Sequence, residues 1–252
     1  MSTGVQTAIG KFVWHENNST DAEKAKTFYT ELLGWELDVW KPGEMDYAMI
    51  KVGDQMHGGF GTAQGDAPSH WLGHVLVEDV DETARRAEAA GGKIAFGPSD
   101  MPEIGRFALI VDPQGAVFSV YSPEGEAPIS EGTFLWDELI TSDVDGAKSF
   151  YTEVLGWTTR DMGMGDAGTY TIFQRAGEVD VAGCMAAPEG MQAPPHWLPY
   201  LATDDVDATV AKAKELGATA FVEGDDIPNI GRIAVLQDPV GAIFGLFKPA
   251  EA

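Results

Sequence analysis

The chain has 252 residues, enough for one large domain or for two domains of about 125 residues each. Its 40 Asp and Glu residues outnumber 16 Lys and Arg residues, and the net charge of −24 argues against nucleic-acid and membrane partners. A single cysteine excludes an intrachain disulfide framework, and no apolar run reaches the roughly 20 residues of a membrane span. The first residues lack the basic and apolar regions of a signal peptide, so we expect a cytoplasmic protein.

The first predicted unit begins with a short strand at 12–14 and continues into a helix from Asp21 to Gly34. Thr20 and Glu23 have the spacing of a capping box, in which the hydroxyl caps the helix and the glutamate reaches back. Glycine at the end suits the left-handed position after a helix. Three further strands are expected at 36–40, 47–52 and 56–60.

The second predicted unit repeats this order. A strand at 71–77 precedes a helix from Asp79 to Gly92, which begins with an Asp cap and Glu82 three residues later. Strands follow at 93–96, 107–111 and 117–121, and Asp112-Pro-Gln-Gly115 forms the last turn.

The rest of the chain is a second copy of the first half. Residues 14–35 and 136–157 are identical at twelve of 22 positions, and residues 102–118 and 228–244 at ten of 17. Helices are therefore expected again from Asp143 to Gly156 and from Asp205 to Gly217. A Pro-, Gly- and acid-rich linker at 122–130 predicts two tandem domains, at 8–123 and 131–248.

This pattern resembles the vicinal oxygen chelate superfamily, which includes glyoxalase I, the bleomycin-resistance proteins and the extradiol dioxygenases. Helix text that ends in FY..LLGW and a DP.GA.F hairpin carry the resemblance, which extends from about Gly10 to Lys248. It implies an α+β fold with four βαβββ modules in two tandem glyoxalase-like domains. Because this superfamily contains lyases, oxygenases, isomerases and binding proteins on one scaffold, the fold alone does not define the activity.

In catalytic members of this family, paired modules form a cup that holds a divalent metal on their first and last strands. None of the corresponding residues in this chain is His, Glu, Gln or Asp, so the resemblance implies that the usual metal site is absent and that no cofactor is needed. These positions are Trp14, Gly59, Leu72 and Ser119 in the first half, and Trp136, Gly183, Leu198 and Gly245 in the second.

Strand alternation places other polar residues on the same faces. We expect catalytic candidates at Glu16, His70 and His74 in the first half, and at Glu138, His196 and Tyr200 in the second. Glu16, His70 and His74 form a two-histidine, one-carboxylate set that also suits a divalent metal, so a displaced metal site remains an alternative. The structural alternative is that His70 and His196 bond loop carbonyls and that Glu16 is a solvated charge.

Aromatic residues predict a planar or apolar ligand. The candidate substrate-binding residues are Trp14, Tyr47, Trp71 and Arg106 in the first half, and Trp136, Tyr170, Trp197 and Arg232 in the second. Both arginines lie in Ile-Gly-Arg; they suit a substrate carboxylate, or a structural clamp to nearby acids, which is the interpretation we favour. His15 is expected at the surface and His57 in a loop.

Two functions stay open. One is a metal-free protein, monomer or homodimer, that binds a small aromatic or carbonyl-containing molecule. The other is a lyase, isomerase or dioxygenase-like enzyme that uses Glu16 with His70 and His74. A role as a scaffold for other proteins is a weaker hypothesis, because it gives no function to the two predicted cups.

Overall fold

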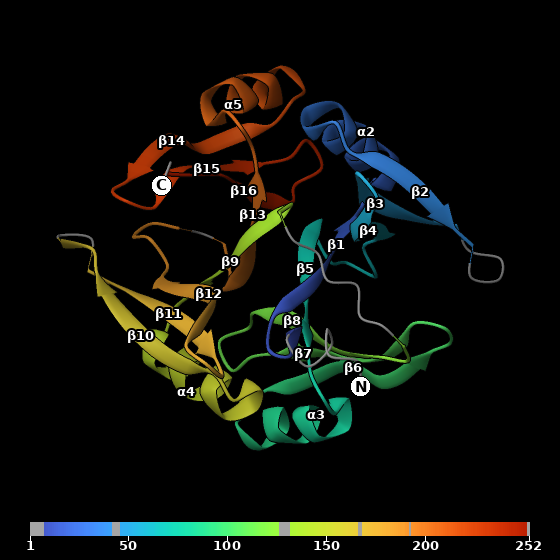
Figure 1. The fold of residues 1–252 in the computed structure, drawn as a ribbon, viewed down its shortest axis with the longest axis vertical. Helices are drawn as coiled ribbons and strands as arrows, with labels where there is room; N and C mark the ends of the chain where they lie inside the picture. Colours follow the sequence, from blue (N-terminus) through green and yellow to red (C-terminus); the bar gives the residue numbers. More distant parts are fainter. Residues whose placement is uncertain (1–7, 42–45, 126–131, 166–167, 192, 251–252) are drawn as a thin grey trace. The chain divides into compact units, whose positions relative to one another are not determined.

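The computed structural model describes residues 8–41, 46–125, 132–165, 168–191 and 193–250. The first half contains eight strands and two helices among these residues (Figure 1). They are β1 (Phe12–Ser19), α2 (Ala22–Leu33), β2 (Glu36–Trp40), β3 (Tyr47–Val52), β4 (Gln55–Thr62), β5 (His70–Leu76), α3 (Val80–Ala89), β6 (Lys93–Met101), β7 (Gly105–Val111) and β8 (Val117–Pro123).

The second half repeats these elements in the same order. They are β9 (Phe134–Thr141), α4 (Val144–Leu155), β10 (Thr158–Gly163), β11 (Thr169–Arg175), β12 (Val179–Ala186), β13 (His196–Ala202), α5 (Val206–Glu215), β14 (Thr219–Ile227), β15 (Gly231–Gln237) and β16 (Ile243–Pro249). The predicted α+β architecture of four βαβββ modules is therefore confirmed. Most of the predicted linker, from residue 126 to 130, lies outside the described residues.

Each half forms one eight-stranded sheet. The strand order is β2-β3-β4-β1-β5-β8-β7-β6 in the first half and β10-β11-β12-β9-β13-β16-β15-β14 in the second. In each module the first strand pairs in parallel with the last, as β1 does with β4 and β9 with β12. Each sheet is therefore built from the strands of one half.

Four aspartates begin the four helices. Asp21, Asp79, Asp143 and Asp205 each accept a hydrogen bond from the backbone N–H three residues later. The prediction that Thr20 caps the first helix is wrong, because its hydroxyl lies 3.0 Å from Ser69 Oγ and Asp21 is the cap. Gly34 and Gly156 adopt the left-handed conformation after α2 and α4, as expected.

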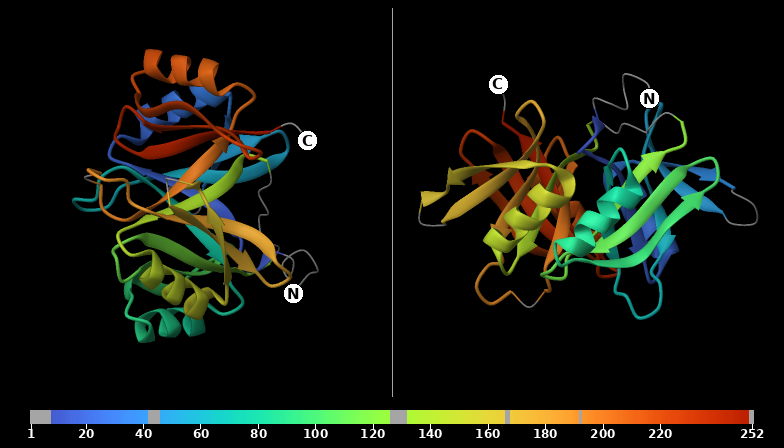
Figure 2. Two further views of the ribbon diagram at one scale, coloured as in Figure 1. Left: turned by 90° about the vertical axis from the view of Figure 1, so that its left-hand side faces the viewer. Right: turned by 90° about the horizontal axis from the view of Figure 1, so that it is seen from below.

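Contacts divide the described residues into two compact units, each with a module from each half. Within the described residues, unit 1 comprises 8–13, 73–125, 136–165, 168–191 and 193–197, and unit 2 comprises 14–41, 46–72, 132–135 and 198–250. In unit 1, α3 lies beside α4, and in unit 2, α2 lies beside α5 (Figures 1 and 2). Each unit has its own apolar core, centred on these helix pairs.

A buried Trp–Tyr–Asp chain connects the modules inside each unit. In unit 1, Trp197 Nε1 donates to Tyr151 Oη at 3.0 Å, and Tyr151 donates to Asp112 Oδ2 at 3.0 Å. Asp112 belongs to the predicted turn, and its Oδ1 accepts the backbone N–H groups of residues 114 to 116. Unit 2 repeats the arrangement with Trp71, Tyr29 and Asp238. A helix of one half is thus hydrogen-bonded to a turn of the other.

Candidate functional site

Three side chains in unit 1 form a hydrogen-bonded trio on the open face of the sheet, which is the face turned away from the helices. Trp136 and Glu138 lie two residues apart on β9, so both point to the same face. Tyr170, on β11, accepts a hydrogen bond from Trp136 Nε1 at 2.8 Å and donates one to Glu138 Oε1 at 2.7 Å. Glu138 is only 7% exposed, while the two rings are half-buried. We call Trp136, Tyr170 and Glu138 the second trio.

The tyrosine hydroxyl of this trio occupies the space of a missing side chain. Gly183, on β12, is the residue that pairs with Glu138 across the parallel strands. A Cβ atom at Gly183 would overlap Tyr170 Oη and would lie 2.8 Å from Trp136 Nε1. Only glycine fits here while the tyrosine is in place.

Unit 2 contains the equivalent first trio, formed by Trp14 and Glu16 on β1 and Tyr47 on β3. Trp14 Nε1 donates to Tyr47 Oη at 3.1 Å, and Tyr47 is hydrogen-bonded to Glu16. Burial, and next the negative charge of Glu16, raise the pKa of the Tyr47 hydroxyl well above its ordinary value, so it remains protonated at neutral pH. A Cβ atom at Gly59 would overlap Tyr47 Oη, as at Gly183.

The two trios differ at one neighbouring position. In the first, Asn18 Nδ2 donates to Glu16 Oε2 at 3.2 Å. In the second, the corresponding residue is Ile140, which has no donor to offer. The carboxylate of the first trio therefore has an additional neutral donor beside it.

The second module of each half carries different residues at the paired positions. In unit 1, His74 pairs with Ser119 across β5 and β8. The same face of that module carries Phe107, whose ring stacks on the 51% exposed ring of Phe96 at 5.6 Å. In unit 2, the ring of Tyr200 fills the space beside its partner Gly245, where a Cβ atom would collide with it.

The strand register corrects the predicted metal positions. The partners of Gly59 and Ser119 are Glu16 and His74, rather than Trp14 and Leu72, and those of Gly183 and Gly245 are Glu138 and Tyr200, rather than Trp136 and Leu198. Each register partner lies two residues beyond the predicted first-strand position and therefore on the same face of the strand. Ligand-type side chains therefore do stand on the first strands.

These residues nevertheless do not fit a divalent metal. Gly59, Gly183 and Gly245 supply no ligand atom, and a tyrosine side chain fills the space at each. Among the described residues, no three His, Cys, Asp or Glu side chains come close enough together to hold a metal ion. Glu16, His70 and His74 accordingly do not assemble as the alternative ligand set.

His70 and His196 are each bonded to a nearby turn. Their Nδ1 atoms lie 2.8 Å from the carbonyl oxygens of Pro68 and Pro194. Burial lowers the pKa of His196, although its carbonyl contact opposes this. These contacts match the structural alternative for both histidines.

Two predicted ligand-binding tryptophans lie elsewhere. Trp71 and Trp197 are each 5% exposed and pack in the cores under the helices. The alternation that places His70 and Leu72 on the open face turns Trp71 to the opposite face, and the same holds for Trp197. Both belong to the buried Trp–Tyr–Asp chains, so the prediction that they contact a ligand is corrected.

The predictions for His15 and His57 are also wrong. His15 is 2% exposed and its ring stacks on Phe134 at 4.0 Å. His57 lies in β4 rather than in a loop and is likewise 2% exposed. Strand alternation correctly places His15 on the face opposite Glu16, but that face is the buried side of β1.

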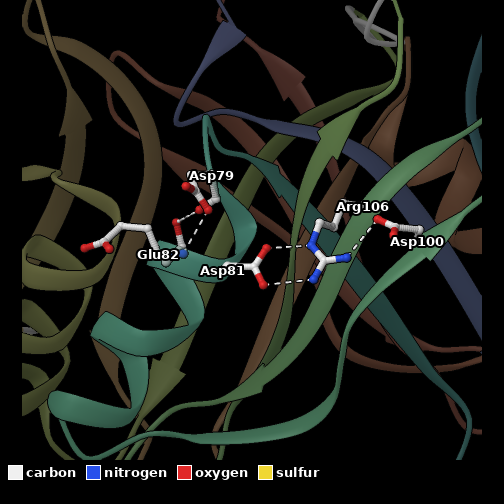
Figure 3. A network of polar contacts seen from close by, with 6 residues as sticks. Asp79, Asp81, Glu82, Asp100 and Arg106 are labelled. Atoms are coloured by element: carbon white, nitrogen blue, oxygen red, sulfur yellow. Dashed lines mark hydrogen bonds and ion pairs between the residues drawn. The ribbon is translucent and has the colours of Figure 1, made fainter.

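Arg106 and Arg232 are held by acidic neighbours at the surface. Arg106 forms a two-pronged contact with Asp81, at 2.6 and 2.8 Å, and a third hydrogen bond with Asp100 at 2.8 Å (Figure 3). This contact holds the pKa of Asp81 below its ordinary value. Arg232 is bonded in the same way to Asp207 and Asp226. The contacts are those of a clamp between a helix start and a hairpin.

Comparison with known proteins agrees with this geometry. The family model described as "Glyoxalase/Bleomycin resistance protein/Dioxygenase superfamily" matches residues 12–120 and 133–246. The Mycobacterium tuberculosis protein named "Putative glyoxylase CFP32" is 36% identical over 94% of both chains. The Streptomyces peucetius protein named anthracycline biosynthesis protein DnrV is 32% identical over 97% of this chain and 95% of its own.

Solved structures share the fold. The Mn(II)-bound glyoxalase from Novosphingobium aromaticivorans matches with a TM-score of 0.66 at 17% identity, covering 95% of this chain and 82% of that one. The 2,2′,3-trihydroxybiphenyl 1,2-dioxygenase from Sphingomonas wittichii matches with a TM-score of 0.65 at 16% identity, covering 95% and 90%. In the described part of the chain, no helix has the length and apolarity to cross a membrane. With both halves matched by the family model, the chain belongs to the glyoxalase, bleomycin resistance and dioxygenase superfamily.

Proposed function

We propose that this protein binds a small aromatic molecule at the two Trp–Tyr–Glu trios, without a metal ion. The observation that carries the proposal is the tyrosine hydroxyl above Gly183 and Gly59, because it fills the space beside the closing strand. A first-strand carboxylate is kept in both halves, but its neighbour there is a tyrosine and not a second ligand.

The hydrogen-bond directions define which ligand group fits. In the first trio, Trp14 donates its only side-chain N–H to Tyr47, and Tyr47 donates its only side-chain O–H to Glu16. The first trio therefore presents acceptor oxygens and ring faces, and a ligand that binds there must supply the donor. A hydroxylated or amine-bearing aromatic molecule meets both requirements.

A relative's name supports an aromatic ligand. DnrV, which aligns with nearly the whole chain, is named for anthracycline biosynthesis, and anthracyclines are planar fused-ring molecules. We therefore choose 2,6-dihydroxyanthraquinone as the test ligand, because its two hydroxyl donors lie too far from the quinone carbonyls to bond to them internally.

The proposal is tested by titration of the purified protein with this quinone, followed through its absorbance. Loss of a hydrogen bond to a charged group costs about 1.5–3 kcal/mol, so Glu138→Gln should weaken binding by about 10- to 100-fold. Glu153→Gln, an exposed change of equal charge on α4, is the control. Saturable binding that none of the trio variants weakens, or no binding, would contradict the proposal.

Metal content is measured on the same samples, purified without a His-tag or chelator. We expect far less than one metal ion per chain, even after soaking with Mn²⁺ or Zn²⁺. About one ion per chain, lost on Glu16→Gln, would instead support the displaced metal site.

A second candidate is an enzyme that removes a proton next to a carbonyl group, as a lyase or isomerase. The Tyr–Glu hydrogen bond favours it, because a carboxylate held by a tyrosine is positioned as a general base. The name of CFP32 points the same way. Exchange of the carbon-bound hydrogen of methylglyoxal hemithioacetal for deuterium in D₂O, lost on Glu16→Gln or Glu138→Gln, would select this function over binding alone.

A further inference from the structure

We infer that Asn18 makes the first trio selective for ligands with a neutral NH₂ group, of which an aromatic carboxamide is the simplest. This rests on the proposed function and names the ligand class of its first site. A single hydroxyl donor would satisfy Glu16 alone, so the proposed function by itself does not make this distinction.

Asn18 lies two residues after Glu16 on β1, so both side chains are on the open face. Asn18 Nδ2 donates a hydrogen bond to Glu16 Oε2 at 3.2 Å. A carboxylate only accepts hydrogen bonds, so the N–H side of the amide faces Glu16 and the carbonyl oxygen is turned away from it. The amide thus places a second type of acceptor next to the carboxylate.

Gly61 leaves room beside both acceptors. It pairs with Asn18 across β1 and β4, and a Cβ atom at this position would lie 2.6 Å from Asn18 Oδ1 and 3.4 Å from Glu16 Oε1. Gly61 is not among the glycines with a positive φ angle, so its backbone conformation does not require glycine. All three residues are half-buried, and two acceptor oxygens border the place where a side chain would otherwise be.

A group that donates twice fits this place better than a group that donates once. A hydroxyl group has one hydrogen, so one of the two oxygens would face the lone pairs of the ligand. The NH₂ group of a carboxamide has two N–H bonds on one nitrogen, one for Glu16 and one for Asn18. Glu16 can accept this bond in addition to those from Tyr47 and Asn18, because a carboxylate has about four acceptor sites.

The second half lacks this arrangement. Ile140 and Met185 take the places of Asn18 and Gly61 and pair in the same register across β9 and β12. Both side chains are apolar, and Ile140 is 5% exposed. We therefore expect one carboxamide site per chain, in the first half.

Three neutral probes with one ring system test the number of donors. 2-Naphthamide has two N–H bonds, N-methyl-2-naphthamide has one, and 2-acetonaphthone has none but matches 2-naphthamide in size. In isothermal titration calorimetry we expect one 2-naphthamide per chain, bound at least about tenfold more tightly than 2-acetonaphthone, with the N-methyl compound between them. Because no probe is charged, the net charge of −24 does not favour one over another.

Variants at Asn18 and Gly61 locate the effect. Asn18→Ile should weaken 2-naphthamide binding by about two- to tenfold and remove the preference for it over the N-methyl compound. Gly61→Ala should act in the same way, because its methyl group displaces Asn18 Oδ1, which is the end of a side chain and can move without disturbing the fold. Thr62→Ile, at an exposed neighbouring position on β4, and Gly163→Ala, where a Cβ atom meets nothing within 4 Å, are the controls.

Equal binding of 2-naphthamide and 2-acetonaphthone would overturn the inference, and so would equal effects of Asn18→Ile and Thr62→Ile. Two equivalent carboxamide sites per chain would also overturn it, since the second half has no counterpart of Asn18. If no naphthalene probe binds, the inference fails, and the titration with 2,6-dihydroxyanthraquinone separately decides the proposed function.

Discussion

Gly183→Ala tests whether the second trio is built as described. The added methyl group would overlap the Tyr170 hydroxyl and would lie 2.8 Å from Trp136 Nε1, so the tyrosine has to move. Moving it breaks the 2.8 Å and 2.7 Å hydrogen bonds on either side of the hydroxyl. Overpacking costs about 1–3 kcal/mol and the lost bond to a charged group about 1.5–3 kcal/mol, which together predict a destabilisation of about 2.5–6 kcal/mol.

The assay is urea unfolding, with binding of 2,6-dihydroxyanthraquinone measured in parallel. Gly163→Ala is the matched control: it also lies in a strand of the same module, but a Cβ atom there meets nothing within 4 Å. Tyr170→Ala should remove most of the cost of Gly183→Ala, because the methyl group then enters the vacated space. An equal cost of Gly183→Ala and Gly163→Ala, or an unchanged cost in the Tyr170→Ala background, would refute the proposed packing.

Four further substitutions probe the remaining structure. Tyr151→Phe should destabilise unit 1 by about 1–3 kcal/mol at pH 7. Burial raises the pKa of Asp112 in the folded protein, so the charged carboxylate opposes folding above that pKa, and this effect is lost as the pH falls to the pKa of the unfolded chain. Because the Tyr151 hydroxyl stabilises the charged form of Asp112, the destabilisation by Tyr151→Phe in urea unfolding should become smaller towards pH 4. An equal destabilisation at pH 7 and pH 4 would contradict this. Trp71→Phe should lower the melting temperature and leave the affinity for the quinone unchanged, whereas Trp136→Phe should weaken quinone binding. If Trp71→Phe weakened binding and Trp136→Phe did not, the ligand would lie under the helices. Arg106→Gln should leave quinone binding at the wild-type level in the same titration, because its guanidinium is engaged by acidic neighbours, and a loss of affinity would return Arg106 to the ligand site.

Local signals in the sequence were sufficient to predict the four βαβββ modules. The helix ends follow from Asp caps and from glycines such as Gly34, whose left-handed conformation matches a position where glycine has the least strain. The Asp112 turn is equally local, because its side chain binds the backbone within the next four residues. Elements of this kind depend on few distant contacts, so their residue types predict them.

Prediction of the two trios requires the strand pairing and register, which the residue types alone do not contain. Tyr47 and Tyr170 were expected near a ligand, but their bonds to Glu16 and Glu138 depend on which strands pair and in which register. One signal was present in the repeat: Tyr47 matches Tyr170, as Gly59 matches Gly183, inside the same two modules. Glycine retained opposite a carboxylate in both copies indicates that another side chain fills its space.

The same distinction explains the compact units. Sequence similarity relates the first half to the second, yet each core joins a module of one half to a module of the other through Tyr151 and Asp112, or Tyr29 and Asp238. These contacts hold α2 with α5 and α3 with α4, and so place the anchoring bonds on the helix side of every sheet. The open faces, which carry the two trios, are therefore separate from these anchoring bonds. A protein built in this way can exchange a metal ligand for a tyrosine on the open face without disturbing the cores that hold its modules together.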